Sequence, residues 1–322
     1  YEILRCLVGS EMCIRDSVWR ADRPQRGRYR QFMQCDIDIL GEPTILAEIE
    51  LILATTTLLG KLDFKNFTIR INDRRILKAM AAYSGFAEAD YDTVFIILDK
   101  MDKIGLDGVK EELLKEGYAE DAVTKYLELF EKVTADISGV QYLKETLGAF
   151  LPEEVAENLK TIIDSVESTK SADFKMAFDP TLVRGMSYYT GPIFEISMDE
   201  YGGSVGGGGR YDKMVGKFTG NDVPACGFSI GFERVCGILL EQGYQIPGAK
   251  QKIALLYGKD ADFTAVLSRA AALRDTYNVT VLPQGKKLGK QLGQLEAAGF
   301  AGAAFMDLSL IHISEPTRHL RI

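Results

Sequence analysis

The sequence predicts a mixed α/β protein with two domains. Three observations support this prediction: helical periodicity rich in Lys, Glu and Leu from about residue 76 to 168, strand-like segments on both sides of it, and a β-α-β-α-β pattern within residues 253–307. With 322 residues, 46% apolar and 26% charged, the chain can bury a sizeable core. Pro247 and Gly248 mark residues 245–252 as a linker between the domains.

Both ends of the chain read as translated DNA adapter. Residues 8–17 and residues 308–317 can be written as one DNA element in opposite orientations, because the reverse complement of one codon run encodes the other. Ten consecutive codons match at each end, which argues against coincidence. We therefore expect residues 1–17 and 308–322 to be artefacts of a transposon-type sequencing library, and we exclude them from fold reasoning. The first domain then covers residues 18–244.

This exclusion removes both histidines of the chain, His312 and His319. A histidine base, a Ser-His-Asp triad and a histidine-bound metal are then excluded unless further sequence supplies a histidine. Five cysteines show neither metal-ligand spacing nor the density of a disulfide framework, which predicts a reducing, cytoplasmic location. The sequence contains no run of 18 apolar residues, so no membrane span is expected. The net charge of -8 argues against indiscriminate nucleic-acid binding but allows a local basic site.

Arginines crowd the start of the first domain, where only Asp22 opposes them. They are Arg20, Arg23, Arg26, Arg28 and Arg30. Residues 24–27 read as the loop of a β-hairpin, with Arg20 on one strand and Phe32 and Gln34 on the other. A cation beside an aromatic ring on a rigid sheet could bind a triphosphate and stack a purine. A plain basic surface hairpin is the alternative, although five close arginines repel one another unless an anion binds.

The next segments are expected to be scaffold. Residues 43–62 predict an amphipathic helix, and residues 67–71 predict a short strand. Residues 76–168 then predict a helical insertion, whose charge runs are expected to be solvated faces.

Residues 182–196 are the most informative stretch and read Leu-Val-Arg-Gly-Met-Ser-Tyr-Tyr-Thr-Gly-Pro-Ile-Phe-Glu-Ile. Arg184 offers a planar, always charged fork suited to phosphate, and Tyr188 and Tyr189 offer hydroxyls that donate and accept hydrogen bonds. The β-prone segment that follows carries Glu195 as its one charge. This pattern favours an anionic, ring-bearing ligand. A surface hairpin with a solvated arginine and two core tyrosines is the alternative.

Two glycine-rich segments follow. Six glycines within residues 202–209 permit either a close approach of the backbone to a ligand or strand, or a flexible turn, and the segment matches no phosphate-loop motif. Residues 225–240 predict a strand that leads into an apolar helix. Gly227 and Gly231 would leave one sheet face bare for a flat group, with Arg234 at its rim in the first helical turn. Close strand-to-helix packing is the alternative.

The second domain predicts a small parallel sheet. Strands are expected at residues 253–257, 279–282 and 301–305, and helices at residues 260–277 and 288–298. Lys286, Lys287 and Lys290 surround the start of the second helix, where they could touch RNA phosphates or form a solvated basic turn.

Taken together, these segments resemble a class II aminoacyl-tRNA synthetase, and specifically the histidyl-tRNA synthetase family. Residues 20–38 are similar to motif 2 of that family, residues 182–195 to its histidine-specific signature, residues 227–234 to its motif 3, and residues 208–212 to a further family element. The resemblance covers nearly all of residues 18–307. It implies a catalytic domain with an antiparallel sheet flanked by helices, and a truncated C-terminal α/β domain that binds the anticodon.

The resemblance also implies a reaction, in which ATP activates L-histidine to histidyl-adenylate and the histidyl group passes to tRNA(His). Arg20 would hold the α-phosphate and Arg184 would stabilise charge that grows on its phosphorus, so these two would be the catalytic residues. The implied ATP-binding residues are Arg20, Arg28, Phe32 and Arg234. The implied histidine-binding residues are Gln34, Asp38, Arg184, Tyr188 and Tyr189. Mg²⁺ would bridge the phosphates with unknown protein ligands, and the full-length protein would be a homodimer.

Several departures from the family pattern matter. Asp38 is one methylene shorter than the usual glutamate, which would route its contact through water. Asp22 and Ser187 stand where glutamate and aspartate are commonest. The chain also lacks the N-terminal part with motif 1 and the dimer interface, which puts dimerisation and catalysis by this fragment in doubt.

Two other functions stay open at this point. One is a non-catalytic paralogue such as the regulatory subunit of ATP phosphoribosyltransferase, against which Arg184, Tyr188 and Tyr189 argue. The other is an RNA-binding, synthetase-like module.

Overall fold

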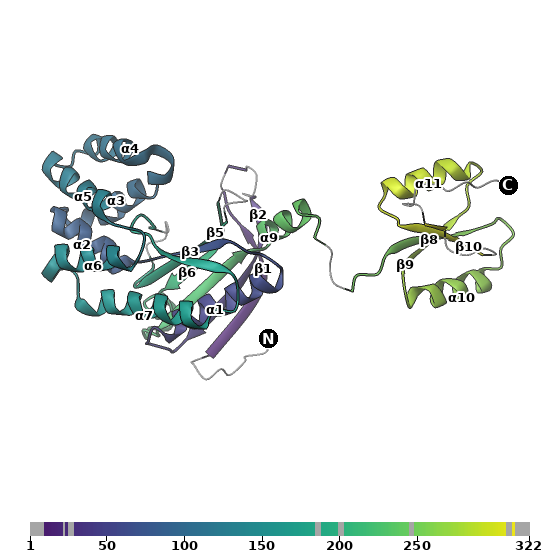
Figure 1. Ribbon diagram of the computed structural model, residues 1–322, viewed down its shortest axis with the longest axis horizontal. Coiled ribbons are helices and arrows are strands. Elements are labelled where there is room, and N and C mark those ends of the chain that lie inside the picture. Colours follow the sequence, from purple (N-terminus) through teal and green to yellow (C-terminus); the bar gives the residue numbers. More distant parts are fainter. Residues whose placement is uncertain are drawn as a thin grey trace. The chain divides into compact units, whose positions relative to one another are not determined.

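A computed structural model describes residues 10–21, 23–24, 29–183, 188–198, 203–244, 248–306 and 311–312. The chain divides into two compact units, Tyr1–Gln242 and Gly243–Ile322 (Figure 1). The division lies next to the predicted linker at residues 245–252. Within the described part of the chain, no helix combines the length and the apolar character needed to cross a bilayer.

The first unit is built on a seven-stranded sheet with the order β1-β2-β7-β6-β5-β3-β4. Its strands are β1 (Ser10–Trp19), β2 (Gln31–Leu40), β3 (Phe67–Asp73), β4 (Phe174–Phe178), β5 (Pro192–Met198), β6 (Gly203–Arg210) and β7 (Ala225–Gly231). Neighbouring strands are antiparallel apart from β3 and β4, which run parallel. The expected antiparallel sheet is therefore confirmed except at this edge, where the sequence analysis had not identified β4.

Strand β1 contains residues that the sequence analysis assigned to an adapter. Its pairing with β2 is continuous from Ser10 opposite Leu40 to Trp19 opposite Gln31. Strand pairing uses backbone N–H and C=O groups, which nearly every residue type supplies, so it carries no information about where a sequence came from. The adapter origin of residues 8–17 stays a prediction.

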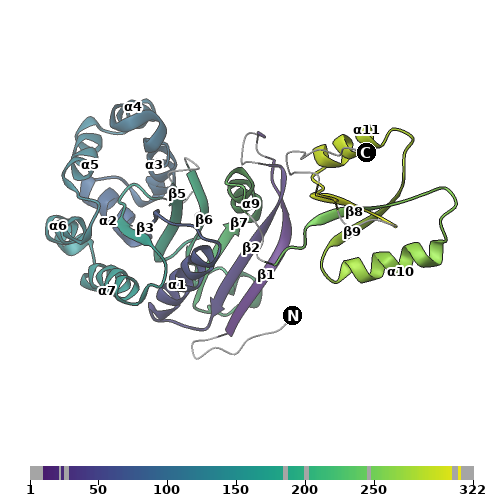
Figure 2. The same cartoon turned by 45° about the vertical axis from the view of Figure 1, so that its right-hand side comes forward.

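Nine α-helices of the first unit are described. They are α1 (Leu46–Lys61), α2 (Arg74–Ser84), α3 (Tyr91–Leu98), α4 (Met101–Lys115), α5 (Glu120–Lys132), α6 (Ile137–Leu147), α7 (Glu153–Thr169), α8 (Gly216–Thr219) and α9 (Phe232–Glu241). The predicted helical insertion corresponds to α2 through α7, which follow one another between β3 and β4. Figures 1 and 2 show α2 to α6 gathered beside the end of the sheet that carries β3.

One face of this sheet is apolar because side chains alternate along each strand. The register aligns Cys35 of β2 with Ile230 of β7, and Ile196 of β5 with Ile69 of β3. Helix α1 packs on β2 and β7, and α7 packs on β3. The main hydrophobic core of the first unit includes residues of both helices and of the sheet. The other face is consequently free to carry polar residues and glycine.

The second unit is a four-stranded sheet with the order β11-β10-β8-β9. Its elements are β8 (Lys252–Tyr257), α10 (Phe263–Arg274), β9 (Asn278–Pro283), α11 (Leu288–Ala297), β10 (Gly302–Phe305) and β11 (Ile311–His312). Strands β8, β9 and β10 are parallel, as predicted from the β-α-β-α-β pattern, and β11 is antiparallel to β10.

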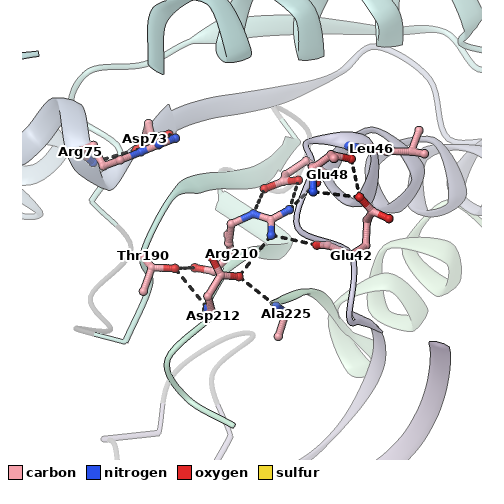
Figure 3. Close-up of polar contacts among 10 residues, drawn as sticks. Glu42, Leu46, Glu48, Asp73, Arg75, Thr190, Arg210, Asp212 and Ala225 are labelled. Atoms are coloured by element: carbon pink, nitrogen blue, oxygen red, sulfur yellow. Dashed lines mark hydrogen bonds and ion pairs between the residues drawn. The ribbon is translucent and has the colours of Figure 1, made fainter. Parts of the chain in front are cut away.

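Arg210, at the end of β6, ties the sheet to the start of α1 (Figure 3). Its Nε and Nη2 atoms donate to the two carboxylate oxygens of Glu48 at 2.6 and 2.7 Å. The guanidinium also donates to the carbonyl oxygens of Thr44 and Glu42 at 2.6 and 3.1 Å, and to Oδ1 of Asp212 at 3.2 Å. Glu48 is fully buried. A buried, bidentate pair of this kind fixes β6 against α1.

Replacing Arg210 should therefore destabilise the first unit. We expect Arg210→Met to lower the free energy of unfolding by about 3–5 kcal/mol, because it leaves the Glu48 charge buried without a partner. Adding Glu48→Gln should recover part of the loss. Urea unfolding followed by circular dichroism measures both changes.

The matched control for Arg210→Met is Lys160→Met, which removes a cation from an exposed pair with Asp164. This change should cost no more than about 0.5 kcal/mol. Equal losses in the two single variants would contradict the structural role of Arg210.

Candidate active site

Two cavities adjoin on the polar face of the first sheet. The aspartate cavity has a volume of about 360 Å³ and is lined by Asp36, Asp38 and three tyrosines, Tyr188, Tyr189 and Tyr211. The arginine cavity has a volume of about 320 Å³ and is lined by Arg20, Phe32, Glu195, Glu233 and Arg234. Gln34, Gly207 and Ser229 line both cavities. Ligands in the two cavities would therefore meet above these three residues.

Glycine forms the floor of both cavities, and we call Gly207, Gly227 and Gly231 the glycine floor. Gly227 pairs with Asp38 on β2, and a Cβ atom added to it would lie 2.0 Å from Asp38 Oδ1. Gly231 pairs with Gln34, and a Cβ atom added there would lie 3.3 Å from Arg234 Cδ. Side chains from neighbouring elements thus lie across these positions. The predicted glycine face lines the cavities, but side chains of Asp38, Tyr211 and Arg234 partly cover it, so it is not bare.

The arginine cavity brings together residues that are far apart in the sequence. Arg20 follows β1 directly, and its backbone N–H donates to the carbonyl oxygen of Arg30 at 2.9 Å. Its guanidinium carbon lies 3.9 Å from the ring centroid of Phe32, a cation–π contact. Arg234 lies in the first turn of α9 and donates to the carbonyl oxygen of Ser204. Arg28 lies outside the described residues.

Glu233 also ties α9 to β2, because its Oε1 accepts from the backbone N–H of Met33 at 2.7 Å. The bond places the first turn of α9 beside the hairpin strand that carries Phe32. Arg20, Phe32 and Arg234 therefore line one cavity from different elements.

The aspartate cavity holds a buried carboxyl group among phenols. Tyr211 donates its hydroxyl hydrogen to Asp38 Oδ1. Burial raises the pKa of the Asp38 carboxyl; the Tyr211 hydrogen bond opposes this shift, and the Asp36 charge adds to it. The Tyr188 and Tyr189 rings lie 4.6 Å apart, and Tyr188 meets Tyr211 edge-on at 6.1 Å. At the other end of the cavity, Gln34 Nε2 donates to Ser229 Oγ at 2.6 Å.

The segment that contains Arg184 is held at both ends, although Arg184 itself lies outside the described residues. On its N-terminal side, buried Asn72 donates to the carbonyl oxygens of Leu182 and Pro180 at 3.0 and 3.3 Å. On its C-terminal side, the backbone N–H of Thr190 donates to the carbonyl oxygen of Arg210 at 2.8 Å. The described ends of this segment are thereby fixed, with Tyr188 and Tyr189 lining the aspartate cavity.

Three residues at or beside the site were missed by sequence reasoning. The position of Ser229 could have been predicted, because it lies two residues from both Gly227 and Gly231 and side chains two apart on a strand point to the same face. Tyr211 lies within the matched residues 208–212, but its contact with Asp38 depends on the pairing of distant strands. Asn72 is a polar residue at the end of a predicted strand, where no local pattern indicates its partner.

The comparison with known families agrees with this geometry. Residues 9–235 match the family model described as Histidyl-tRNA synthetase. The chain belongs to the histidyl-tRNA synthetase family. It is 45% identical over 302 residues to a Histidine–tRNA ligase of Leifsonia xyli, a match that covers 90% of this chain and 68% of that relative. It is 40% identical over 230 residues to the Histidine–tRNA ligase of Korarchaeum cryptofilum, which covers 70% of this chain and 52% of that relative.

Solved structures show the same fold. The histidyl-tRNA synthetase from Nostoc sp. PCC 7120 superposes with a TM-score of 0.70 at 27% identity, covering 91% of this chain and 69% of that one. An ATP phosphoribosyltransferase regulatory subunit/histidyl-tRNA synthetase from Bacillus halodurans superposes with a TM-score of 0.72 at 18% identity. The match covers 92% of this chain and 73% of that one. The second likeness concerns the fold alone. The family fold therefore does not separate a ligase from a regulatory subunit.

The raised pKa of Asp38 predicts how stability depends on pH. A carboxyl whose pKa is higher in the folded state binds more protons there, so the wild-type chain loses stability as pH rises above the ordinary value of 3.8. The loss is complete above the folded-state pKa. Asp38→Asn removes this titration and keeps an oxygen that can accept the Tyr211 hydrogen bond. We expect the variant to be more stable than wild type at about pH 7 and equally stable at about pH 3.

Urea unfolding at the two pH values measures the difference between Asp38→Asn and wild type. A difference that stays constant between them would show that burial of the ionised carboxylate is not its cause.

Proposed function

We propose that this chain is the catalytic part of a histidine–tRNA ligase, which joins L-histidine to ATP as histidyl-adenylate and transfers the histidyl group to tRNA(His). The supporting observation is the meeting of two chemically different cavities at Gln34, Gly207 and Ser229. Adenylation joins the amino-acid carboxylate to the α-phosphate, so the two substrates must lie end to end with these groups in contact. Two adjoining cavities provide this arrangement.

The arginine cavity is suited to ATP. Phe32 offers an aromatic face for adenine, and Arg20 and Arg234 offer cations for the phosphates and the second adenine face. Because the Arg20 guanidinium lies over the Phe32 ring, we expect it to move to the α-phosphate when ATP binds. Arg28 is proposed as a further ATP ligand on the family resemblance.

The chemistry requires charge stabilisation rather than a protein base. The carboxylate of free histidine is ionised near neutral pH, so it attacks the α-phosphorus without losing a proton. The bond to the pyrophosphate leaving group then breaks, and negative charge grows on the α-phosphate oxygens. Arg20, together with Arg184 on the family resemblance, would stabilise that charge. This accounts for a site built from arginines without histidine.

Mg²⁺ would enter this site with the phosphates. The described residues contain no group of three or more His, Cys, Asp or Glu side chains that could hold a metal. Glu195 and Glu233 nevertheless line the arginine cavity, and Mg²⁺ is commonly held by one or two carboxylates together with substrate phosphates. The donor set therefore fits an ion that arrives with ATP. The ion would neutralise phosphate charge.

The aspartate cavity is suited to L-histidine. Asp38 can accept a hydrogen bond from an imidazole N–H, while Tyr189 and Tyr188 can donate to or pack against the ring. Tyr211 already donates to Asp38 and so orients the carboxylate, which compensates for the shorter side chain. Gln34 donates to Ser229, which leaves its amide oxygen to accept from the substrate amino group.

The remaining partners follow from the family. The second unit would bind the tRNA anticodon, and Lys286, Lys287 and Lys290 near the start of α11 would contact its phosphates. A homodimer and a cytoplasmic location are proposed on the same ground. The matches cover 68% and 52% of the length of the Leifsonia xyli and Korarchaeum cryptofilum relatives.

A regulatory subunit of ATP phosphoribosyltransferase is the competing function. It would keep the fold without needing an ATP site beside the amino-acid site. The joint lining of one cavity by Arg20, Phe32 and Arg234 therefore favours the ligase.

The glycine floor predicts that a side chain added at Gly227 weakens histidine binding. Gly227→Ala should weaken L-histidine binding by at least about tenfold, because the new methyl group would displace the Asp38 carboxylate. Isothermal titration calorimetry measures the affinity. Gly237→Ala in α9 is the control, because beyond its chain neighbours and its own helix backbone no described atom lies within 4 Å of the added Cβ, and it should leave binding unchanged. Equal affinities of both variants and wild type would contradict the proposed pocket.

The position of Arg20 in the arginine cavity predicts that its replacement slows catalysis. Arg20→Ala should lower histidine-dependent ATP–pyrophosphate exchange by about 10²–10³-fold through lost transition-state stabilisation, with L-histidine affinity retained. Arg23→Ala removes the same charge from an exposed position outside both cavities and should change exchange little. Histidine binding without any exchange by the complete, adapter-free protein would favour the regulatory function.

A further inference from the structure

We propose that Arg70 is a positioning residue of the arginine cavity, which holds the Glu195 carboxylate beside the glycine floor and offsets its charge so that the triphosphate of ATP can bind there. The inference rests on the proposed function, because it takes the arginine cavity to be the ATP site. The sequence analysis placed Arg70 only within a strand expected to be scaffold, and the family resemblance gave it no role.

Glu195 is the residue that makes such an offset necessary. It lies on β5 and lines the arginine cavity together with Arg20 and Arg234. The register sets Glu195 opposite Gly207, which belongs to the junction of the two cavities and has no side chain to shield it. A carboxylate at this position repels a triphosphate unless its charge is offset.

Arg70 lies on the other side of Glu195. The two residues are directly opposite each other on neighbouring strands, β3 and β5, where side chains of opposite charge stabilise a sheet. Nη1 of Arg70 lies 3.7 Å from Oε1 of Glu195, a distance within the range of an ion pair but longer than a hydrogen bond. Arg70 therefore attracts the Glu195 carboxylate, while other contacts hold the guanidinium in place.

The guanidinium is held by Asp179, which directly follows β4. Nε and Nη2 of Arg70 both contact Oδ2 of Asp179. Asp179 accepts in turn from the backbone N–H and the hydroxyl of Thr181 at 2.8 and 2.6 Å, and its own N–H donates to the carbonyl oxygen of Ile71 at 2.9 Å. The Arg70 and Asp179 side chains are only 21% and 14% exposed, so salt screens this pair weakly. The fold thus sets the position of the cation that faces Glu195.

Three described carboxylates share this one cation. The third belongs to Asp102 in the first turn of α4, 3.4 Å from Nη1 and Nη2 of Arg70, and its side chain is 68% exposed. Burial lowers the pKa of the Arg70 guanidinium, but the three carboxylates together raise it by more, so Arg70 stays charged throughout the physiological pH range. Loss of Arg70 would therefore make the surroundings of Glu195 more negative by one elementary charge.

The test compares ATP with adenosine, which has the same base and sugar but no phosphates. Affinities for the 322-residue chain are measured by ligand-observed NMR titration in EDTA, so that Mg²⁺ cannot offset the Glu195 charge in place of Arg70. The variants are Arg70→Met, Glu195→Gln and the two combined, and circular dichroism checks that each is folded. Lys160→Met is the control, because Lys160 is an exposed cation of α7 that lines neither cavity.

We expect Arg70→Met to weaken ATP binding by about three- to tenfold, because the Glu195 charge then acts on the phosphates, and to leave adenosine binding within about twofold of wild type. Glu195→Gln should strengthen ATP binding by a similar factor. The double variant should bind ATP about as tightly as wild type, because the two changes cancel in charge. Lys160→Met should change neither affinity.

Equal weakening of ATP and adenosine by Arg70→Met would assign Arg70 a structural role and overturn the inference, as would weak ATP binding by the double variant. If Arg70→Met does not fold, unchanged or weaker ATP binding by Glu195→Gln overturns the inference in the same way. A wild-type chain that bound neither ligand would instead overturn the arginine cavity as the ATP site, and this inference with it.

Discussion

The absence of side chains at three central strand positions is the constraint on which this site depends. Gly207, Gly227 and Gly231 lie on β6 and β7, in the middle of a sheet whose opposite face is packed against α1 and α7. Any larger residue at Gly227 would meet the Asp38 carboxylate. Glycine weakens a strand, so β6 and β7 need support from elsewhere. The buried Arg210–Glu48 pair supplies such support at the end of β6.

Charge then divides the floor into two regions. Arg20, which follows β1, and Arg234 of α9 line one cavity together with Glu195 and Glu233, whereas the charged residues that line the other cavity are Asp36 and Asp38 of β2. Cations that can attract an anionic nucleotide therefore lie on one side. The residues between the cavities are small or neutral, namely Gly207, Ser229 and Gln34. A reaction between the two ligands can occur only above these residues. The same arrangement explains why one strand, β2, contributes side chains to both cavities.

Local patterns predicted the elements better than the contacts between them. Period-two alternation and the glycine spacing placed Phe32, Gln34, Gly227 and Gly231 correctly on one sheet face, because these signals lie within single strands. The glycine-rich residues 202–209 were left open between a close backbone approach and a flexible turn, and most of them form the central strand β6.

The contacts between elements required the fold. Only the pairing of β2 with β7 and β6 brings Asp38 to Tyr211, and only burial defines the Arg210–Glu48 pair. The two arginines expected to flank the α-phosphate differ in outcome: Arg20 lines the arginine cavity, whereas the position of Arg184 stays a prediction.

A crystal structure with histidinol and a non-hydrolysable ATP analogue tests the central claim most directly. The account predicts imidazole beside Asp38 and Tyr211, adenine on Phe32, and the two ligands meeting above Gly207 and Ser229. Ligands bound in any other order, or in separate places, would contradict it.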